Sequence, residues 1–381
     1  MPILYSQSPD DLFSPQKRPA LFRVGTPAPS DLQLAVEAAR LAYFRFENAT
    51  DPDPRTQPPL LPQTPEPSPR SKLEASLGTL GFTEFTYIND PVPTLKDLLS
   101  RGGPLSMPLV SLQKLMGTGV TSSPGFNFLG PVGTAIHDLV DQAADRVWQA
   151  LTDLPKADRL AGFTDTQAYV AFRPSDRLAV IAVRGSQANT ANDVLLDGRF
   201  LQVRAEGWTG SLHHGFARGA SVLWKEISKW LDAHDDKPVR LLICGHSLGA
   251  AIATLVAVRT HEKRIPTQLI TIGSPRVGDR EFATDFATKG VNATRVVDRI
   301  DVVTHIPPEN VAFLDYVHVG KPLFINRKGE MRDLPTADNT VNEGSLHQLA
   351  TQLLLGPGLT SILPEWLADH APTNYLRGVF P

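Results

Sequence analysis

The clearest pattern of apolar and polar positions lies in the second half of the chain. Amphipathic or Ala-rich stretches with helical spacing occupy residues 216–234 and the stretch after residue 247. Short apolar runs have the length and composition of buried strands, at 167–172, 178–183, 239–244, 268–272 and 293–297. This alternation predicts an α/β fold with a mainly parallel central sheet and helices on both faces.

The first half of the chain is less regular. Ser30-Asp31-Leu32-Gln33 has the capping-box pattern, which predicts a helix that begins near residue 30. Residues 83–89 alternate as a strand does, and residues 134–154 have apolar positions at helical spacing. Residues 48–70 are rich in proline and predict a linker, whereas 91–133 show no clean period.

These patterns predict the following organisation. Residues 1–29 form an N-terminal arm, which we expect to be loose because it is polar and Pro-rich. Residues 30–47 and 134–381 form one large domain. Residues 48–133 form a Pro-rich linker and an insertion of unknown role, packed on or near the core. The apolar stretch 103–133 is alternatively a second element that faces an interface.

The composition narrows the classes of function. The 381 residues are 41% hydrophobic and 20% charged, with a net charge of -3 and no long basic run, so nothing favours nucleic acid as a partner. No apolar stretch reaches the ~18 residues of a transmembrane segment. The N-terminus lacks the basic and apolar regions of a classical signal peptide. We therefore expect a cytoplasmic protein, although export by a signal-independent route is compatible with the sequence.

The single cysteine, Cys244, rules out an intramolecular disulfide framework and is expected to be buried in a strand. Adjacent residues such as His213 and His214 place their side chains poorly for joint metal ligation, and no cluster has the spacing of a metal site. The sequence therefore predicts neither a metal nor another cofactor.

A candidate nucleophile stands between the apolar run 239–244 and the Ala-rich helix. The sequence Gly245-His246-Ser247-Leu248-Gly249 predicts a strand, a sharp turn and a helix, with a serine at the tip. Small residues on both sides let the strand and helix approach closely, and the helix amides favour negative charge at the hydroxyl. This pattern predicts a nucleophilic Ser247; the alternative is an ordinary βα turn.

A serine nucleophile needs a base within hydrogen-bond reach and a third group that orients the base. The acid should follow a later strand, and the run 293–297 ends before Asp298 and Asp301, which are both candidates. His370, near the C-terminus, is the candidate base. Three other histidines compete with it. His305 lies close to the acid in sequence, His318 lies in an apparent strand, and His347 lies in a predicted helix.

A developing oxyanion requires preorganised donors. The amide of Leu248, directly after the nucleophile, is one natural donor. A second should come from the loop after the run 178–183, where Ser186 follows a small-residue turn. An ordinary β-turn is the alternative for Ser186.

Together these motifs resemble the class 3 lipases, the family of the fungal triacylglycerol lipases. The resemblance extends over about residues 30–47 and 160–376. The matching segments, in chain order, are 183–186, 193–197, 214–216, 245–251, 273–279, 295–308, and 369–370 with Tyr375 following.

The resemblance implies an α/β-hydrolase fold and hydrolysis of carboxylic ester bonds, typically in glycerolipids. It points to Ser247, Asp301 and His370 as the catalytic triad and to Ser186 with the Leu248 amide as the oxyanion hole, with no cofactor. The partner is then a lipid or other ester substrate. Residues 187–200 would form a lid that makes transient contact with a lipid surface, or alternatively a fixed surface helix.

The sequence departs from the family at several points. Val194 stands where the family often has Trp, the cysteine pairs of secreted fungal members are absent, and the segments 48–70 and 91–133 have no recognised counterpart. A phospholipase A1 or an esterase of short or aromatic acyl groups is the alternative within the hydrolases. A non-catalytic binding protein with the lipase fold is the alternative from another class, and the presence of all three triad residues disfavours it.

Overall fold

The computed structural model describes residues 3–44 except 14 and 26, 69–89, 166–185, 202–234, 238–335 except 308 and 310–314, and 365–380. All of them belong to one compact unit, residues 1–90 with 166–381. The helices are α1 (Pro9–Phe13), η1 (Pro15–Lys17), α2 (Asp31–Leu41), α3 (Pro69–Gly78), α8 (His214–Ala233), α9 (Leu248–Glu262), α10 (Arg280–Lys289), η3 (Val302–His305), α12 (Glu365–Ala368) and α13 (Pro372–Val379).

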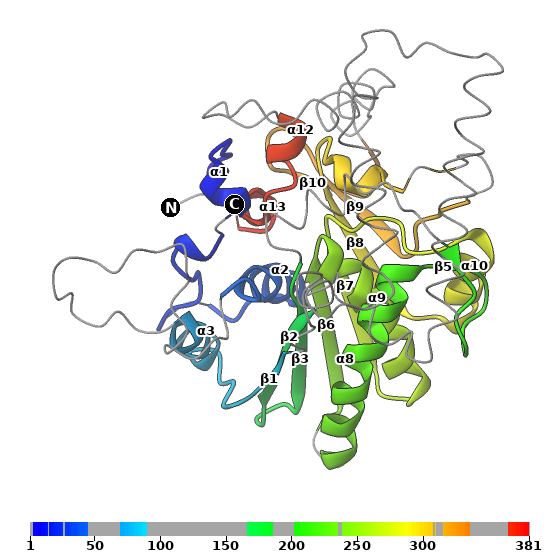
Figure 1. Cartoon of the computed structure of the whole chain (residues 1–381). Coiled ribbons are helices and arrows are strands. Elements are labelled where there is room, and N and C mark those ends of the chain that lie inside the picture. The colour runs from blue at the N-terminus through cyan, green and yellow to red at the C-terminus, as the bar shows by residue number, and fades with distance from the viewer. Residues whose placement is uncertain are drawn as a thin grey trace, which may run out of the picture. The chain divides into compact units, whose positions relative to one another are not determined.

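The strands are β1 (Glu84–Asn89), β2 (Gln167–Arg173), β3 (Leu178–Val183), β4 (Gln202–Val203), β5 (Leu212–His213), β6 (Arg240–His246), β7 (Thr267–Ile272), β8 (Asn292–Asp298), β9 (Lys321–Ile325) and β10 (Met331–Arg332). An eight-stranded sheet has the order β1-β2-β3-β6-β7-β8-β9-β10. From β3 to β9 every neighbouring pair in it is parallel, and the strands at both edges are antiparallel. The expected α/β-hydrolase fold with a mainly parallel sheet is confirmed (Figure 1).

Alternate side chains of the strands enter different apolar layers because successive residues point to opposite faces of a sheet. In β6, Leu241 and Ile243 join the layer beneath α8 and α9, whereas Leu242 and Cys244 join the layer beneath α2 and α13. Figure 1 shows α2 and the pair α8 and α9 on opposite sides of the sheet. Helices on both faces, as expected, therefore cover strands that are apolar on both sides.

Helix α9 is Ala-rich because it lies between the sheet and another helix. It contacts β6 and β7 on one side and α8 on the other, and nearly all of its residues are buried. Small side chains allow this close approach on both sides. The free thiol of Cys244 is buried, as expected, and burial raises its pKa above the ordinary value.

The structure extends two parts of the sequence interpretation. Residues 69–89 lie within the expected linker and insertion but form α3 and β1. The strand expected at 83–89 is confirmed as β1, which lengthens the central sheet beside β2. The N-terminal arm is packed rather than loose, with Asp11 and Phe22 buried. The expected helix at 134–154 and the segments 48–68 and 91–133 lie outside the described residues. Within the described part of the chain, no helix has the length and apolar character that a bilayer span requires.

The predicted start of α2 can be tested by removing its cap. The Ser30 hydroxyl accepts from the Gln33 amide at 3.2 Å, and the Gln33 side chain accepts from the Ser30 amide at 3.0 Å. We expect Ser30→Ala to lower the free energy of unfolding by about 1 kcal/mol, measured by urea denaturation. The control is Ser228→Ala on α8, for which we expect a change within about 0.5 kcal/mol. Equal stability of the two variants would contradict the role of the cap.

Candidate active site

Ser247 occupies a sharp turn between β6 and α9. Its backbone has φ 59° and ψ −131°, a positive φ that L-residues rarely adopt. The Ser247 amide donates to the Ile272 carbonyl at 2.9 Å, which ties the turn to β7. A Cβ at Gly245 would lie 2.4 Å from the Gly249 carbonyl oxygen, so the crossing of strand and helix requires glycine there. The sequence therefore supplies small residues where the backbone segments touch.

His370 and Asp301 form a buried pair at the carboxyl edge of the sheet. Asp301 follows β8, and His370 lies in the turn between α12 and α13. The His370 Nδ1 lies 3.0 Å from Oδ1 and 2.9 Å from Oδ2 of Asp301. An ionised carboxylate only accepts hydrogen bonds, so Nδ1 carries the proton and the lone pair of the neutral ring is on Nε2. This is the tautomer that a general base requires.

The Asp301 carboxylate stays ionised although it is buried. Burial by itself would raise its pKa, but attraction to His370 and hydrogen bonds from His370 and Tyr375 outweigh this, and the pKa lies below 3.8. The Tyr375 hydroxyl donates to Oδ2, and the Val303 amide donates to Oδ1 at 2.9 Å. Asp301 is therefore a fixed negative charge that orients the imidazole.

The structure separates the two candidate aspartates. Asp298 does not pair with His370; its Oδ1 accepts from Arg377 at 2.6 Å. Burial raises the pKa of Asp298 well above 3.8, against the effect of the Arg377 charge. Asp301, which the resemblance favoured, is the carboxylate that contacts His370.

The competing histidines have other surroundings. His318 does not lie in a strand as expected, because only an isolated bridge forms at Val317. Its Nε2 donates to the Thr304 carbonyl at 2.6 Å, and burial lowers its pKa well below 6.5. Burial also lowers the pKa of His305 to about 4. His347 lies outside the described residues.

His246, directly before Ser247, links several elements. Its Nε2 donates to the backbone carbonyl of His370 at 2.8 Å, so its Nδ1 accepts from the Tyr43 hydroxyl at 2.7 Å. Burial lowers the pKa of His246 to about 3, which keeps the ring neutral. The sequence patterns gave no role to the side chains of His246 and Tyr43. The available signal was an imidazole in a buried strand, which must find hydrogen-bond partners.

The expected oxyanion donors are only partly described. Leu248 is the first residue of α9, where helix amides lack partners within the helix. Gly185, after β3, lies against the nucleophile turn, since a Cβ on it would be 3.2 Å from the Ser247 Cβ. Ser186 itself and the lid candidate 187–200 lie outside the described residues, so their roles stay predictions.

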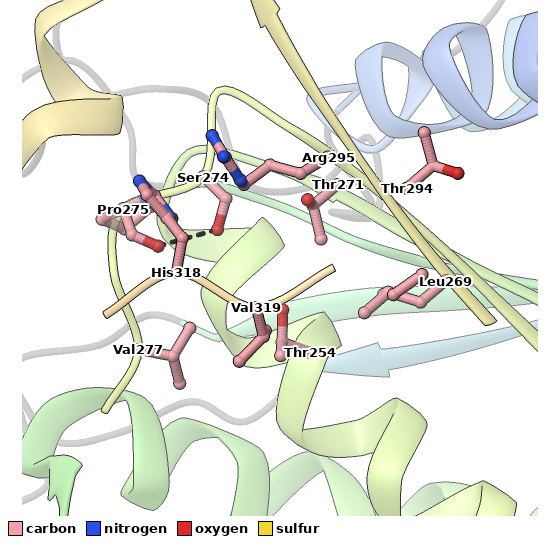
Figure 2. A pocket seen from close by; sticks show the side chains of 11 residues that line it. Thr254, Leu269, Thr271, Ser274, Pro275, Val277, Thr294, Arg295, His318 and Val319 are labelled. Atoms are coloured by element: carbon pink, nitrogen blue, oxygen red, sulfur yellow. Dashed lines mark hydrogen bonds between the residues drawn. The ribbon is translucent and has the colours of Figure 1, made fainter. Parts of the chain in front are cut away.

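A separate small pocket lies between β7, β8 and α9 (Figure 2). Polar and apolar side chains line it, including Thr271, Arg295 and His318. Burial, together with the Arg276 charge, lowers the pKa of Arg295 to about 10. Ser247, Asp301 and His370 do not line this pocket.

Among the described residues, no group of three or more His, Cys, Asp or Glu side chains could hold a metal ion.

The close approach beside Ser247 gives a stability prediction. A Cβ at Gly185 would lie 2.2 Å from the Tyr43 hydroxyl oxygen and 2.6 Å from the His246 carbonyl oxygen. We expect Gly185→Ala to lower the free energy of unfolding by about 1–3 kcal/mol through overpacking. Gly78, which has open space around it, is the matched control, and Gly78→Ala should be neutral or stabilising. Urea denaturation of both variants tests this, and an undiminished stability of Gly185→Ala would refute the close approach.

The chain is similar to several lipases and to a phospholipase A(1). The chloroplastic phospholipase A(1) of Arabidopsis thaliana is 33% identical over 165 residues, and the match covers 36% of each chain. The lipase of Rhizomucor miehei is 31% identical over 169 residues, and the match covers 42% of this chain and 45% of the lipase. The secreted mono- and diacylglycerol lipase A of Penicillium camembertii is 29% identical over 187 residues, 48% of this chain and 59% of that protein.

A solved structure of the Rhizomucor miehei triacylglyceride lipase is 30% identical, with a TM-score of 0.38, and the match covers 42% of this chain and 62% of that one. The chain thus spans less than two thirds of the length of each of these proteins. Residues 180–311 match the family model described as Lipase (class 3). Over these residues, the chain is therefore similar to the class 3 lipases.

Proposed function

We propose that the chain is a serine hydrolase that cleaves carboxylic ester bonds of lipids. The observation that carries this proposal is the buried pair of His370 and Asp301, at the same edge of the sheet as the strained Ser247 turn. The backbone carbonyl of His370 accepts from His246, the residue before Ser247, which keeps the two segments adjacent. The class 3 lipase match over residues 180–311 supports the reaction class.

In this mechanism His370 Nε2 takes the proton of the Ser247 hydroxyl as its oxygen attacks the ester carbonyl carbon. Asp301 stabilises the imidazolium that forms. The Leu248 amide and Ser186 donate hydrogen bonds to the oxyanion. The tetrahedral intermediate expels the alcohol, which takes the proton from His370. Water, deprotonated by His370, then attacks the acyl-enzyme. The second tetrahedral intermediate releases the carboxylic acid, and the Ser247 oxygen takes the proton back from His370.

A phospholipase A1 activity is the second candidate. The similarity to a phospholipase A(1) of Arabidopsis thaliana supports it, as the similarity to the Rhizomucor miehei lipase supports a triacylglycerol lipase. The same triad serves both reactions, so the shape of the acyl and headgroup sites separates them. Comparing hydrolysis of emulsified triacylglycerol with that of phosphatidylcholine vesicles distinguishes the candidates.

We further propose that residues 187–200 contact the lipid surface in either case.

The serine nucleophile is tested with 4-nitrophenyl esters from acetate to palmitate. We expect turnover by the wild type and a loss on the order of 10⁶-fold in kcat for Ser247→Ala, with unchanged circular dichroism. Ser221→Ala is the control, because that hydroxyl bonds the Ala217 carbonyl within α8, and it should keep full activity. A folded wild type that is inactive on all esters and lipids would favour the non-catalytic binding protein.

The two aspartates give opposite signatures. We expect Asp301→Asn to lower kcat by roughly 10⁴-fold, because Asn cannot hold the required tautomer of His370. Asp298→Asn breaks the buried pair with Arg377, so it should lower the free energy of unfolding by a few kcal/mol. The kcat of its folded fraction should stay within about tenfold of wild type. Finding the large kcat loss in Asp298→Asn instead would reverse the assignment of the acid.

A further inference from the structure

Tyr5, in the N-terminal arm, contacts the segment that carries His370. Its hydroxyl donates to Asp369 Oδ1 at 2.7 Å, and Asp369 directly precedes His370. The guanidinium groups of Arg299 and Arg377 each lie 5.0 Å from the centroid of the Tyr5 ring. Tyr5 therefore joins the loop after β8, the turn before α13 and α13 itself.

Asp369 ties the loop after β8 to the histidine turn. Its Oδ1 accepts from Arg299 at 3.1 Å, and its Oδ2 accepts from the Ile300 amide at 3.2 Å. Ile300 is adjacent to Asp301, as Asp369 is adjacent to His370. The Asp369 carboxylate therefore cross-links the backbones that hold the two members of the His370–Asp301 pair.

The arm is also attached through its backbone. The Ser6 amide donates to the Asn374 Oδ1 at 2.9 Å, and the Asn374 Nδ2 donates back to the Ser6 carbonyl at 2.8 Å. The same Nδ2 donates to the Ala368 carbonyl at 2.7 Å, and the side chain of Asn374 is fully buried. This reciprocal pair sets the position of the arm against α13 and so places Tyr5 at Asp369.

We propose that Tyr5 is a positioning residue for His370, and that the N-terminal arm clamps the histidine turn to the acid loop. The effect on turnover rests on the proposed ester hydrolysis. A shift of about 1 Å in a catalytic group can cost on the order of 10²-fold in rate. A loosened clamp should therefore lower kcat and have a smaller effect on the affinity for substrate.

The clamp depends on the charge of Asp369. Burial raises the pKa of Asp369 to about 6, and Arg299 and the Tyr5 hydroxyl oppose this rise. Burial and the nearby Asp369 raise the pKa of the Tyr5 hydroxyl, which stays a proton donor. Other charged or titratable groups around this cluster are Asp298, Asp301, Arg327, Glu365, His370 and Arg377.

The sign of the pH effect follows. The Tyr5 hydroxyl stabilises the carboxylate of Asp369, so removing it raises the pKa of Asp369 further. In Tyr5→Phe, Asp369 then becomes neutral at a higher pH and loses its ion pair with Arg299 there. As the pH is lowered, kcat should therefore begin to fall at a higher pH in the variant than in the wild type.

The matched control is Tyr87→Phe. The Tyr87 hydroxyl also donates to a carboxylate, Glu74, at 3.0 Å, and its ring lies 4.2 Å from the Arg70 guanidinium. These contacts are of the same kind but involve β1 and α3, away from the histidine turn. On a 4-nitrophenyl ester, we expect Tyr5→Phe to lower kcat about tenfold with KM within about twofold. Tyr87→Phe should keep the wild-type kcat and pH profile.

Hydrogen–deuterium exchange of the full chain supplies a readout that needs no activity. We expect faster exchange in Tyr5→Phe confined to residues 365–379, with β6 and α9 unchanged. If Tyr5→Phe shows this faster exchange but the wild type hydrolyses no ester, the proposed function fails and the clamp stands. The clamp is overturned if exchange, kcat and pH profile all match the wild type. It is equally overturned if protection falls uniformly across the sheet, which indicates a purely structural role. Should Tyr5→Phe not fold, Asp369→Asn tests the same link with the same readouts.

Discussion

The buried carboxylate of Asp301 is the constraint on which the rest of the site depends. An ionised group cannot remain in an apolar interior unless hydrogen bonds and opposite charge replace its lost hydration. The amide of Val303 supplies one partner locally, but His370 and Tyr375 come from 69 and 74 residues further along the chain. The C-terminal segment must therefore fold back over the carboxyl edge of the sheet, and this brings the imidazole to the acid.

The same requirement explains the surroundings of the nucleophile turn. The neutral ring of His246 needs a donor and an acceptor, and it finds them in Tyr43 and the His370 carbonyl. The turn at Ser247 is thereby linked to the residues that follow α2 and to the histidine turn at the carboxyl edge of the sheet. Glycines 185, 245 and 249 allow these segments to approach, because a Cβ at any of them would overlap its neighbours. The two hydrogen bonds of the buried His246 ring thus fix the position of the Ser247 turn relative to the histidine turn.

The N-terminal arm shows how long-range contacts escape sequence patterns. Residues 1–29 are polar and Pro-rich, which is typical of a loose segment. Yet Tyr5 and Ser6 bond to partners 364 and 368 residues away. The pattern of residues within the arm does not predict such contacts, because the hydrogen-bond partners of Tyr5 and Ser6 lie at the other end of the chain. The strand expected at residues 83–89 is present as β1, but its place in the central sheet could not be predicted from the sequence, since it joins the sheet only through its pairing with β2.

The sequence by itself determined the local features, because their causes are local. Apolar periodicity specified the strands and helices around β6, the capping box specified the start of α2, and the flanking glycines specified a sharp turn at Ser247. Residue order left Asp298 and Asp301 as equal candidates, and family resemblance alone favoured one of them. Only the tertiary structure decided which carboxylate faces His370 and which pairs with Arg377. Chain order fixes the strand that a side chain follows, whereas its distance to a partner depends on how distant segments pack to satisfy buried charge.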